Sequence, residues 1–239
     1  FFAEVKPTII YHCAAYTAVD AAEDEGKELN YKINVTGTEN VAKAAAKYDA
    51  TLVYISTDYV FEGQKPVGLE LEVDEPANPQ TEYGRTKRLG EEAVEKYAGK
   101  FYTVRTAWVF GNYGKNFVFT MQNLAETRDT LGVVNDQFGR PTWTRTLAEF
   151  MTHLVETKQE FGYYHLSNDS EKGISWYDFA KEILKDKPVT VNPVSSDQFP
   201  AKAKRPLNST MSLAKAKATG FVIPSWQEAL EAFYKQGQK

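Results

Sequence analysis

The chain has 239 residues, of which 42% are hydrophobic and 25% are charged, which is enough for one large domain or one domain with a smaller lobe. Its formal net charge of −4 argues against a protein that binds the phosphate backbone of nucleic acid. The single cysteine, Cys13, excludes an internal disulfide framework. No apolar run of about 18 residues and no cleavable signal pattern occurs. We therefore expect a cytoplasmic protein without nucleic-acid or membrane partners; no pattern indicates its oligomeric state.

The first half of the chain alternates short β-rich segments with amphipathic helical segments. After a helix-like tail at 1–6, we expect strands at 7–15, 50–61 and 100–111, with helices at 34–49 and 82–99. Such alternation is typical of βα units on a parallel sheet. The sequence therefore predicts an α/β fold with a doubly wound, Rossmann-like parallel sheet.

Beyond residue 111 the alternation is looser. We expect helices at 116–126, 144–156, 175–186 and 225–235, a strand at 162–168, and irregular structure from Pro188 to Pro206. The predicted division is a nucleotide-binding domain of 1–111 and 140–167 and a smaller substrate-binding lobe of 112–139 and 168–239.

A glycine-rich phosphate turn normally opens a doubly wound nucleotide-binding domain. No G-x-G-x-x-G occurs in the chain, and Gly111 and Gly114 in FGNYGKN form too short a fragment to replace it. We therefore expect the amino-terminal part of the domain to lie outside this sequence. This polypeptide by itself should bind a dinucleotide poorly, because the amides that cradle the diphosphate belong to that turn. The preference for NADH or NADPH is read by residues beyond the same turn.

Tyr83 and Lys87 in TEYGRTKRLGE are four residues apart, which places both side chains on one face of the predicted helix. The spacing alone is weak evidence, because Tyr177 and Lys181 form a second copy. The surrounding sequence therefore has to distinguish the two pairs.

The strand at 50–61 places Ser56, Thr57 and Asp58 at its carboxyl end, directly before the Tyr83 helix. Ligands of open α/β sheets bind outside the carboxyl ends of the strands. We therefore expect these side chains to share one rim with Tyr83. No such strand end precedes Tyr177, which we interpret as a tyrosine on the apolar face of a helix.

These residue types suit carbonyl reduction without a metal. A tyrosine has a pKa near 10 until a neighbouring cation favours its anion, and Lys87 is such a cation. Tyr83 can then give its proton to a carbonyl oxygen, while the hydroxyl of Thr57 holds that oxygen. The scattered His12, His153 and His165 show no metal-ligand spacing, so we predict no metal site.

Five segments occur in a characteristic order: YISTDYVF, YGRTK, RTAWVFGNYGKNFV, VNDQFGRPT and RPLNSTMS. With them the chain resembles the extended short-chain dehydrogenase/reductase superfamily and, within it, the dTDP-4-dehydrorhamnose reductases, from Pro7 to the last helix. The resemblance implies reduction of dTDP-4-dehydro-β-L-rhamnose to dTDP-L-rhamnose, a cell-wall polysaccharide precursor, with NADPH or NADH as the hydride source.

The resemblance also implies roles for individual residues. Tyr83 would donate the proton, and Lys87 would bind the nicotinamide ribose and lower the pKa of Tyr83. Thr57 would hydrogen-bond the C4 oxygen of the sugar, and Asp58 would contact the sugar. The further implied contacts are to the cofactor from Ala14, Ala15 and Tyr16, and to the substrate from Trp108, Asn112, Asn116 and Arg205.

Several of these residues have simpler explanations. Trp108 also fits a core position at a strand end, and Arg205 also fits a surface ion pair. Asp136 and Gln137 could contact substrate, but a turn explains them equally well.

Two other functions stay open. A non-catalytic homologue that binds a nucleotide or a partner enzyme would not need Thr57, Tyr83 and Lys87 together. A nucleotide-sugar epimerase or dehydratase would share the tyrosine and the lysine. Dehydratases of the superfamily usually have an acidic pair after the active-site threonine, whereas here Tyr59 follows Asp58. The reductase is therefore preferred.

Overall fold

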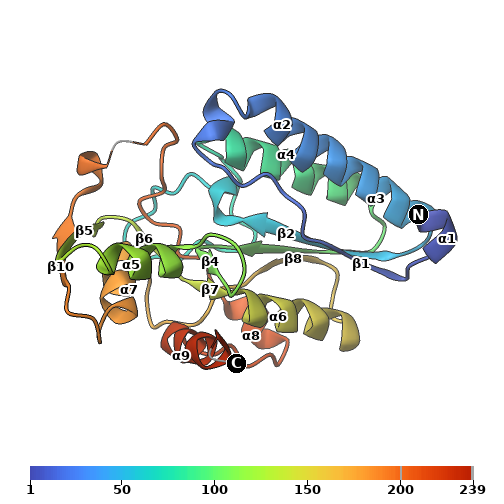
Figure 1. The fold of residues 1–239 in the computed structure, drawn as a ribbon. Coiled ribbons are helices and arrows are strands. Elements are labelled where there is room, and N and C mark those ends of the chain that lie inside the picture. The colour runs from blue at the N-terminus through green and yellow to red at the C-terminus, as the bar shows by residue number, and fades with distance from the viewer. Residues whose placement is uncertain (200, 238–239) are drawn as a thin grey trace.

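A parallel four-stranded sheet forms the centre of the molecule (Figure 1). The computed structural model describes residues 1–199 and 201–237. The strand order is β1-β2-β3-β8, with all neighbours parallel. The strands are β1 (Ile9–His12), β2 (Thr51–Thr57), β3 (Phe101–Thr106) and β8 (Gly162–His165). The predicted α/β fold with a parallel sheet is confirmed.

Helices cover both faces of this sheet, as a doubly wound fold requires (Figure 1). The short α1 (Phe2–Val5) precedes β1. One face carries α2 (Lys27–Tyr31), a π-helical turn (Lys32–Gly37), α3 (Thr38–Lys47) and α4 (Glu82–Tyr97). The other carries α6 (Thr144–Glu156) and α8 (Ala214–Ala218). The helix expected at 34–49 is thus the second part of a longer helical stretch.

The central strand β2 is buried on both faces, which explains its continuous apolar sequence. Leu52 and Tyr54 pack against alanines of α3, including Ala42, and against Val94 of α4. Val53 points to the other face, where it packs with residues of β3, β8, α6 and α8. Both layers of helices are therefore fixed against this strand, which ends at the candidate site.

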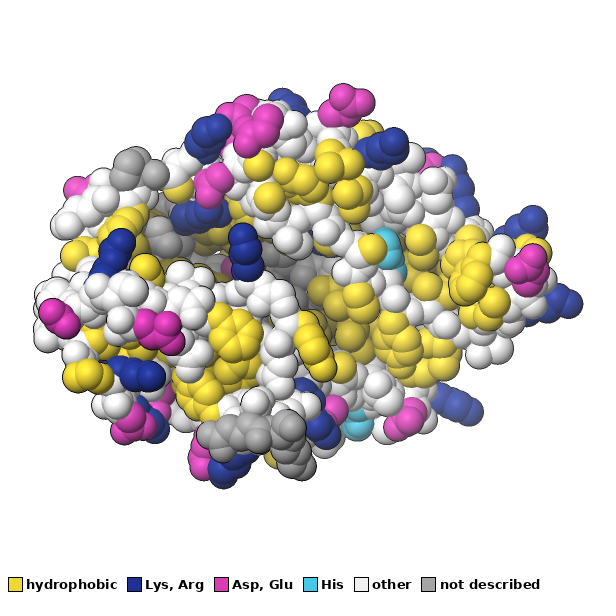
Figure 2. Space-filling model, in the orientation of Figure 1, with side chains coloured by type: hydrophobic (Ala, Val, Ile, Leu, Met, Phe, Trp, Pro, Cys, Tyr) yellow, Lys and Arg dark blue, Asp and Glu magenta, His cyan; other side chains and the backbone are white. Residues whose placement is uncertain are grey.

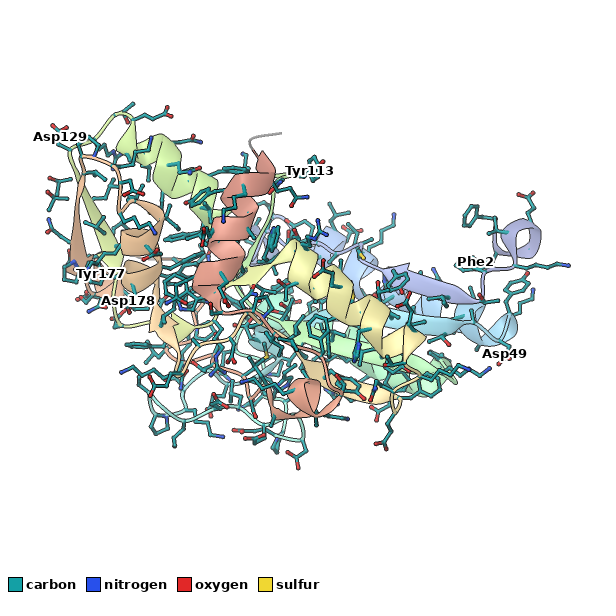
Figure 3. The ribbon with its side chains drawn as sticks, turned by 90° about the horizontal axis from the view of Figure 1, so that it is seen from below. Phe2, Asp49, Tyr113, Asp129, Tyr177 and Asp178 are labelled. Atoms are coloured by element: carbon teal, nitrogen blue, oxygen red, sulfur yellow. The ribbon has the colours of Figure 1, made fainter. Side chains whose placement is uncertain are left out.

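A second group of elements packs around an aromatic core at the end of the molecule away from α1 (Figure 1). The Phe110 ring lies 5.7 Å from the Phe179 ring and 5.5 Å from the Phe233 ring in this core. The elements are α5 (Phe117–Ala125), β5 (Thr130–Val134), α7 (Trp176–Ile183), β10 (Thr190–Val194) and α9 (Trp226–Gly237). Figure 3 places Asp129 and Tyr177 at this end, opposite Phe2 and Asp49.

Short pairings join the two groups. The parallel pair is β4 (Val109–Phe110) with β7 (Thr142–Trp143), and the antiparallel pair is β6 (Phe138–Gly139) with β9 (Ile174–Ser175). Three 3-10 turns occur at Ala21–Glu23, Asp58–Val60 and Ser196–Gln198.

The structure corrects two expected segments. The single strand expected at 100–111 is broken after Thr106, because Trp108 has a left-handed backbone with φ of 49°. The segment 188–206, expected to be irregular, contains β10, which pairs in parallel with β5. Pro193 is tolerated in β10 because a strand of a two-stranded sheet has a free edge for a residue without an N–H.

The predicted division into a nucleotide-binding domain and a smaller lobe stays a prediction. One element assigned to the lobe, α8, packs with the main sheet, since Ala216 shares a core with Tyr164 of β8. The aromatic core likewise includes Phe110, which precedes the predicted boundary.

Candidate active site

The carboxyl end of β2 presents Thr57 and Asp58 at the rim of the sheet. The Thr57 hydroxyl caps the following 3-10 turn by accepting a hydrogen bond of 3.3 Å from the amide of Tyr59. The same hydroxyl donates to Oδ1 of Asp58 at 3.0 Å. These bonds hold both side chains where the strand ends, as the sequence predicted.

The first turn of α4 brings Tyr83 to the same place. Thr81 caps the helix by accepting a hydrogen bond of 3.0 Å from the amide of Gly84. A Cβ at Gly84 would lie 2.1 Å from the carbonyl oxygen of Tyr59, so the close approach of the helix requires glycine there. The rings of Tyr59 and Tyr83 meet edge to face at 5.5 Å.

The pKa of Tyr83 lies above its ordinary value, contrary to the expected lowering by Lys87. Burial of the side chain is the main cause, and the charge of Asp58 adds to it. The hydrogen bond with Thr57 acts in the opposite direction but is the weaker effect. Tyr83 is therefore protonated at neutral pH, which suits a group that donates a proton.

Lys87 lies beneath the rim, with only 2% of its surface exposed. Its Nζ donates a hydrogen bond of 2.7 Å to the carbonyl oxygen of Ile55 and lies 4.2 Å from the centre of the Tyr54 ring. Burial lowers the pKa of Lys87 to about 7, although Glu91 opposes this shift. Its ammonium donates to the Ile55 carbonyl, and Lys87 is not among the groups that shift the pKa of Tyr83. The role at the ribose stays a prediction.

A pocket opens directly beyond Asp58. Figure 2 shows the face on which the molecule is hollowed, with Lys and Arg side chains at the rim of the hollow. The pocket is lined by Asp58, Tyr59, Trp108, Gln137, Trp176, Arg205, Pro206 and Ser209. The pocket brings together three predicted site residues from distant parts of the chain: Asp58, directly after β2, Trp108 and Arg205.

Asp58 supplies the buried charge of this pocket. Its side chain is 3% exposed, and its Oδ2 has no hydrogen-bond partner among residues 1–199 and 201–237. Burial raises the pKa of Asp58 to about 6, although the hydrogen bond from Thr57 opposes this shift. An unpaired buried acceptor in a pocket is suited to a donor on a bound ligand.

Two tryptophans form one wall of the pocket. The rings of Trp108 and Trp176 stack with centroids 3.5 Å apart and planes at 11°. A Cβ at Gly139 would lie 2.7 Å from the Trp108 ring, so that glycine leaves room for the indole. The sequence indicated Trp108 but not Trp176, because no spacing pattern reveals a stack between residues so far apart.

Arg205 connects this pocket to a larger apolar one. Its guanidinium donates a hydrogen bond of 3.2 Å to the Tyr59 hydroxyl and forms an ion pair with Asp20. The apolar pocket is lined by Phe117, Met121, Leu124, Arg128, Leu131, Gly132, Val133, Val134, Gln137, Trp176, Ser196, Phe199, Ala201 and Arg205. Gln137, Trp176 and Arg205 line both pockets, so the two are adjacent. Arg205 thus forms the ion pair of the simpler explanation and also lines both pockets.

Asn112 and Asn116 lie apart from this pocket. Asn112 lines a different hollow with Tyr113 and Arg145. Asn116 caps α5 by accepting from the amide of Phe119 at 3.2 Å, and it donates to the carbonyl oxygen of Gly111 at 2.8 Å. The structure thus gives Asn116 a local capping function, and substrate contact by either residue stays a prediction.

Ala14, Ala15 and Tyr16 follow the carboxyl end of β1. Asn34 clamps this loop by accepting from the Tyr16 amide at 2.8 Å and donating to the Tyr16 carbonyl at 3.1 Å. Ala14 is exposed and Ala15 is half-buried, so the loop offers a small, open backbone surface. These features fit the expected contact with a flat cofactor, which stays a prediction.

The described residues show neither a metal-binding cluster nor a membrane-spanning helix. Across residues 1–199 and 201–237, three or more His, Cys, Asp or Glu side chains nowhere gather as they would around a metal ion. In the same part of the chain, every helix is too short or too polar to cross a membrane.

Replacement of Asp58 by asparagine is expected to stabilise the fold at high pH. The folded state binds the proton of Asp58 more tightly than the unfolded chain does. The stability that this proton contributes is present at low pH and is lost as pH rises through about 6. At pH 8 the unfolding free energy of Asp58→Asn should exceed that of the wild type by about 1–3 kcal/mol. Near pH 4 the two should agree.

Urea unfolding at both pH values measures this difference. The exposed Asp186 provides a matched control, because Asp186→Asn removes a carboxylate that is already in water. If Asp58→Asn is no more stable than the wild type at pH 8, burial of the Asp58 carboxylate does not destabilise the folded state.

The family model described as the RmlD substrate binding domain matches residues 1–239. The dTDP-4-dehydrorhamnose reductase of Aggregatibacter actinomycetemcomitans is 39% identical over 241 residues, covering 95% of this chain and 80% of that protein.

Solved structures agree with this relationship. A dTDP-4-dehydrorhamnose reductase of Bacillus anthracis in complex with NADP superimposes with a TM-score of 0.92 at 42% identity, covering 98% of this chain and 83% of that one. The Clostridium acetobutylicum structure gives a TM-score of 0.94 at 41% identity, with coverages of 100% and 84%. With the parallel fold and with Thr57 and Tyr83 at the rim of its sheet, the chain belongs to the dTDP-4-dehydrorhamnose reductase family.

Proposed function

We propose that the chain acts as an NAD(P)H-dependent ketoreductase that converts dTDP-4-dehydro-β-L-rhamnose to dTDP-L-rhamnose, with Tyr83 as the proton donor. The observation that supports the residue assignment is the contact of Thr57 with Tyr83 beside Asp58 and Tyr59, which line the pocket. Family membership supports the reaction. A cytoplasmic location stays a prediction.

The nicotinamide cofactor supplies the hydride for C4 of the sugar. On the protein side, Tyr83 gives its proton to the C4 oxygen as negative charge develops there. Thr57 hydrogen-bonds the same oxygen and orients it. Because burial keeps Tyr83 protonated at neutral pH, the proton is available before the reaction begins.

The two adjacent pockets suit the two halves of a nucleotide sugar. The sugar would occupy the pocket of Asp58, where Oδ2 accepts a hydrogen bond from a sugar hydroxyl and Trp108 covers the ring. The base would lie in the apolar pocket between α5, α7 and β5. Arg205 lines both, so its guanidinium is placed to meet the diphosphate between them.

The cofactor would be held by residues on the opposite side of the rim. Ala14, Ala15 and Tyr16 provide an open backbone surface after β1, and Lys87 would bind the ribose. In the expected division, the domain of 1–111 and 140–167 carries this part, and the smaller lobe of 112–139 and 168–239 carries the nucleotide of the substrate.

The decisive assay follows oxidation of NADPH and NADH with dTDP-4-dehydrorhamnose as the substrate. Reduced sugar should form in equal amount to the oxidised cofactor. Conversion of a dTDP-sugar to an epimer or a dehydrated product without cofactor oxidation would favour the epimerase or dehydratase alternative. Binding of nucleotide without any turnover would favour the regulatory alternative.

Lys87→Met is expected to weaken cofactor binding and to lower the rate together. The ammonium of Lys87 is proposed to bind the ribose, so its loss should also misplace the nicotinamide and slow hydride transfer, and methionine keeps most of the length of the side chain without its charge. Fluorescence titration with NADPH should show a dissociation constant raised by about tenfold or more, as loss of a charged hydrogen bond implies.

Lys181→Met is the matched control, since it removes the lysine of the second tyrosine–lysine pair, whose Nζ lies 5.5 Å from the Tyr177 ring. It should leave the dissociation constant unchanged. Equal constants for the wild type and Lys87→Met would refute the ribose role.

A further inference from the structure

The surroundings of Lys87 contain a feature that the proposed reaction does not use. An ammonium has three donors, and the structure shows one of them bonded to the Ile55 carbonyl at 2.7 Å. The face of the Tyr54 ring lies 4.2 Å from the same Nζ. At this distance, a desolvated ammonium is attracted by the negative face of the ring.

The position of Tyr54 is fixed on several sides. The residue is fully buried in β2, and its ring stacks on His12 at 5.4 Å with planes at 28°. A Cβ at Gly90 of α4 would lie 2.4 Å from the Tyr54 hydroxyl oxygen. Glycine there, three residues after Lys87, lets the helix lie close enough for the lysine to reach the ring.

The charged groups around Lys87 compensate only in part for the burial of its ammonium. Burial lowers the pKa of Lys87 to about 7, and Glu91 is the group that raises it. Glu91, however, is already paired with Arg105 and Arg88. Burial raises the pKa of Tyr54, so its ring acts as a neutral quadrupole. The titratable or charged groups that act on Lys87 or contact it are His12 on β1, Tyr54 on β2 and Glu91 on α4.

We propose that Tyr54 is a positioning residue for Lys87: the face of its ring holds the ammonium at the carboxyl end of β2 in its charged form. The carbonyl of Ile55 orients the ammonium, and the Tyr54 ring replaces part of the favourable hydration that the charge loses on burial. The effect on turnover rests on the proposed role of Lys87, whereas the effect on the titration of Lys87 does not.

The expected sign follows from the chemistry of an amine. The ammonium form is present below the pKa and is lost as pH rises through about 7. A ring with less electron density on its face attracts the ammonium less strongly, so the titration midpoint of Lys87 should move to lower pH. Loss of the whole contact should move it by about one pH unit.

Fluorinated phenylalanines at position 54 test this without changing the shape of the core. Tyr54→Phe keeps the ring face, and each added fluorine withdraws electron density from it. The protein carries lysine labelled with carbon-13 at Cε, and the Lys87 signal is identified by its absence in Lys87→Met. The midpoint should match the wild type in Tyr54→Phe and fall step by step with fluorination. Tyr54→Leu should show the largest shift.

Tyr97→Leu is the matched control, because it removes a ring that lies 4.7 Å from Lys43 and 4.9 Å from Lys96, away from the site. It should leave the Lys87 midpoint unchanged. A midpoint independent of fluorination would overturn the proposal, as would a shift in Tyr54→Phe equal to that in Tyr54→Leu.

Turnover gives a second, separable result. The alkaline limb of kcat/KM should move with the Lys87 midpoint across the fluorinated series. If the midpoint moves while the limb stays fixed, the ring still holds the ammonium, but the proposed function of Lys87 in the reaction is wrong.

Discussion

Tyr83→Phe is expected to lower kcat for the keto sugar by a factor of about one hundred to ten thousand, the usual effect of removing a general acid. Phenylalanine keeps the ring that packs against Tyr59 at 5.5 Å, so the fold and the affinity for NADPH should persist. Steady-state oxidation of NADPH measures the loss, and fluorescence titration measures the affinity.

Tyr177→Phe is the control for this variant. Tyr177 packs against the aromatic core of α5, α7 and α9, with Lys181 over its ring at 5.5 Å. Its kcat should equal that of the wild type. Near-normal turnover by Tyr83→Phe, or a large loss in Tyr177→Phe at unchanged stability, would show that the proton donor has been assigned to the wrong tyrosine.

Glu91→Gln is expected to cost about 3–5 kcal/mol of unfolding free energy, because it leaves the buried guanidinium of Arg105 without its counter-charge. Glu91 has no exposed side-chain surface and Arg105 has 4%. The two form a double hydrogen bond, with Nε to Oε1 at 2.8 Å and Nη2 to Oε2 at 3.0 Å. This pair ties α4 to β3, so activity should fall together with stability.

The neighbouring Glu92→Gln separates a buried from an exposed ion pair. Glu92 contacts Arg88 at 3.2 Å, and its side chain is 50% exposed. Solvent screens such a pair, so the variant should lose at most about 1 kcal/mol. Urea unfolding of both variants provides the comparison. Equal losses would mean that burial of Glu91 does not determine the strength of its pair.

The placement of Tyr83 and Lys87 on one face of a helix could be predicted from the sequence. Helical spacing is a local property, and the cap formed by Thr81 and the amide of Gly84 fixes the start of α4. A distant contact there is the close approach of Gly84 to Tyr59. The hydroxyl-rich end of β2 could also be predicted, because a parallel strand buried on both faces has a continuous apolar sequence that stops where the rim begins.

The environment of each reacting group depended on tertiary structure. From the sequence, Lys87 was expected to lower the pKa of Tyr83, but burial raises that pKa and the ammonium donates to the Ile55 carbonyl. Desolvation depends on everything that packs around a side chain, so no spacing along the chain reveals the size of the shift.

The walls of the pocket likewise depended on contacts across the chain. Trp176 stacks on Trp108 only because the left-handed turn at Trp108 and the small Gly139 allow it. β10 formed within a proline-containing segment that had no strand pattern of its own, because its partner β5 supplies the hydrogen bonds. Local periodicity therefore determined the elements and the rim of the site, whereas packing between distant segments decided the shape of the pocket and the charge states within it.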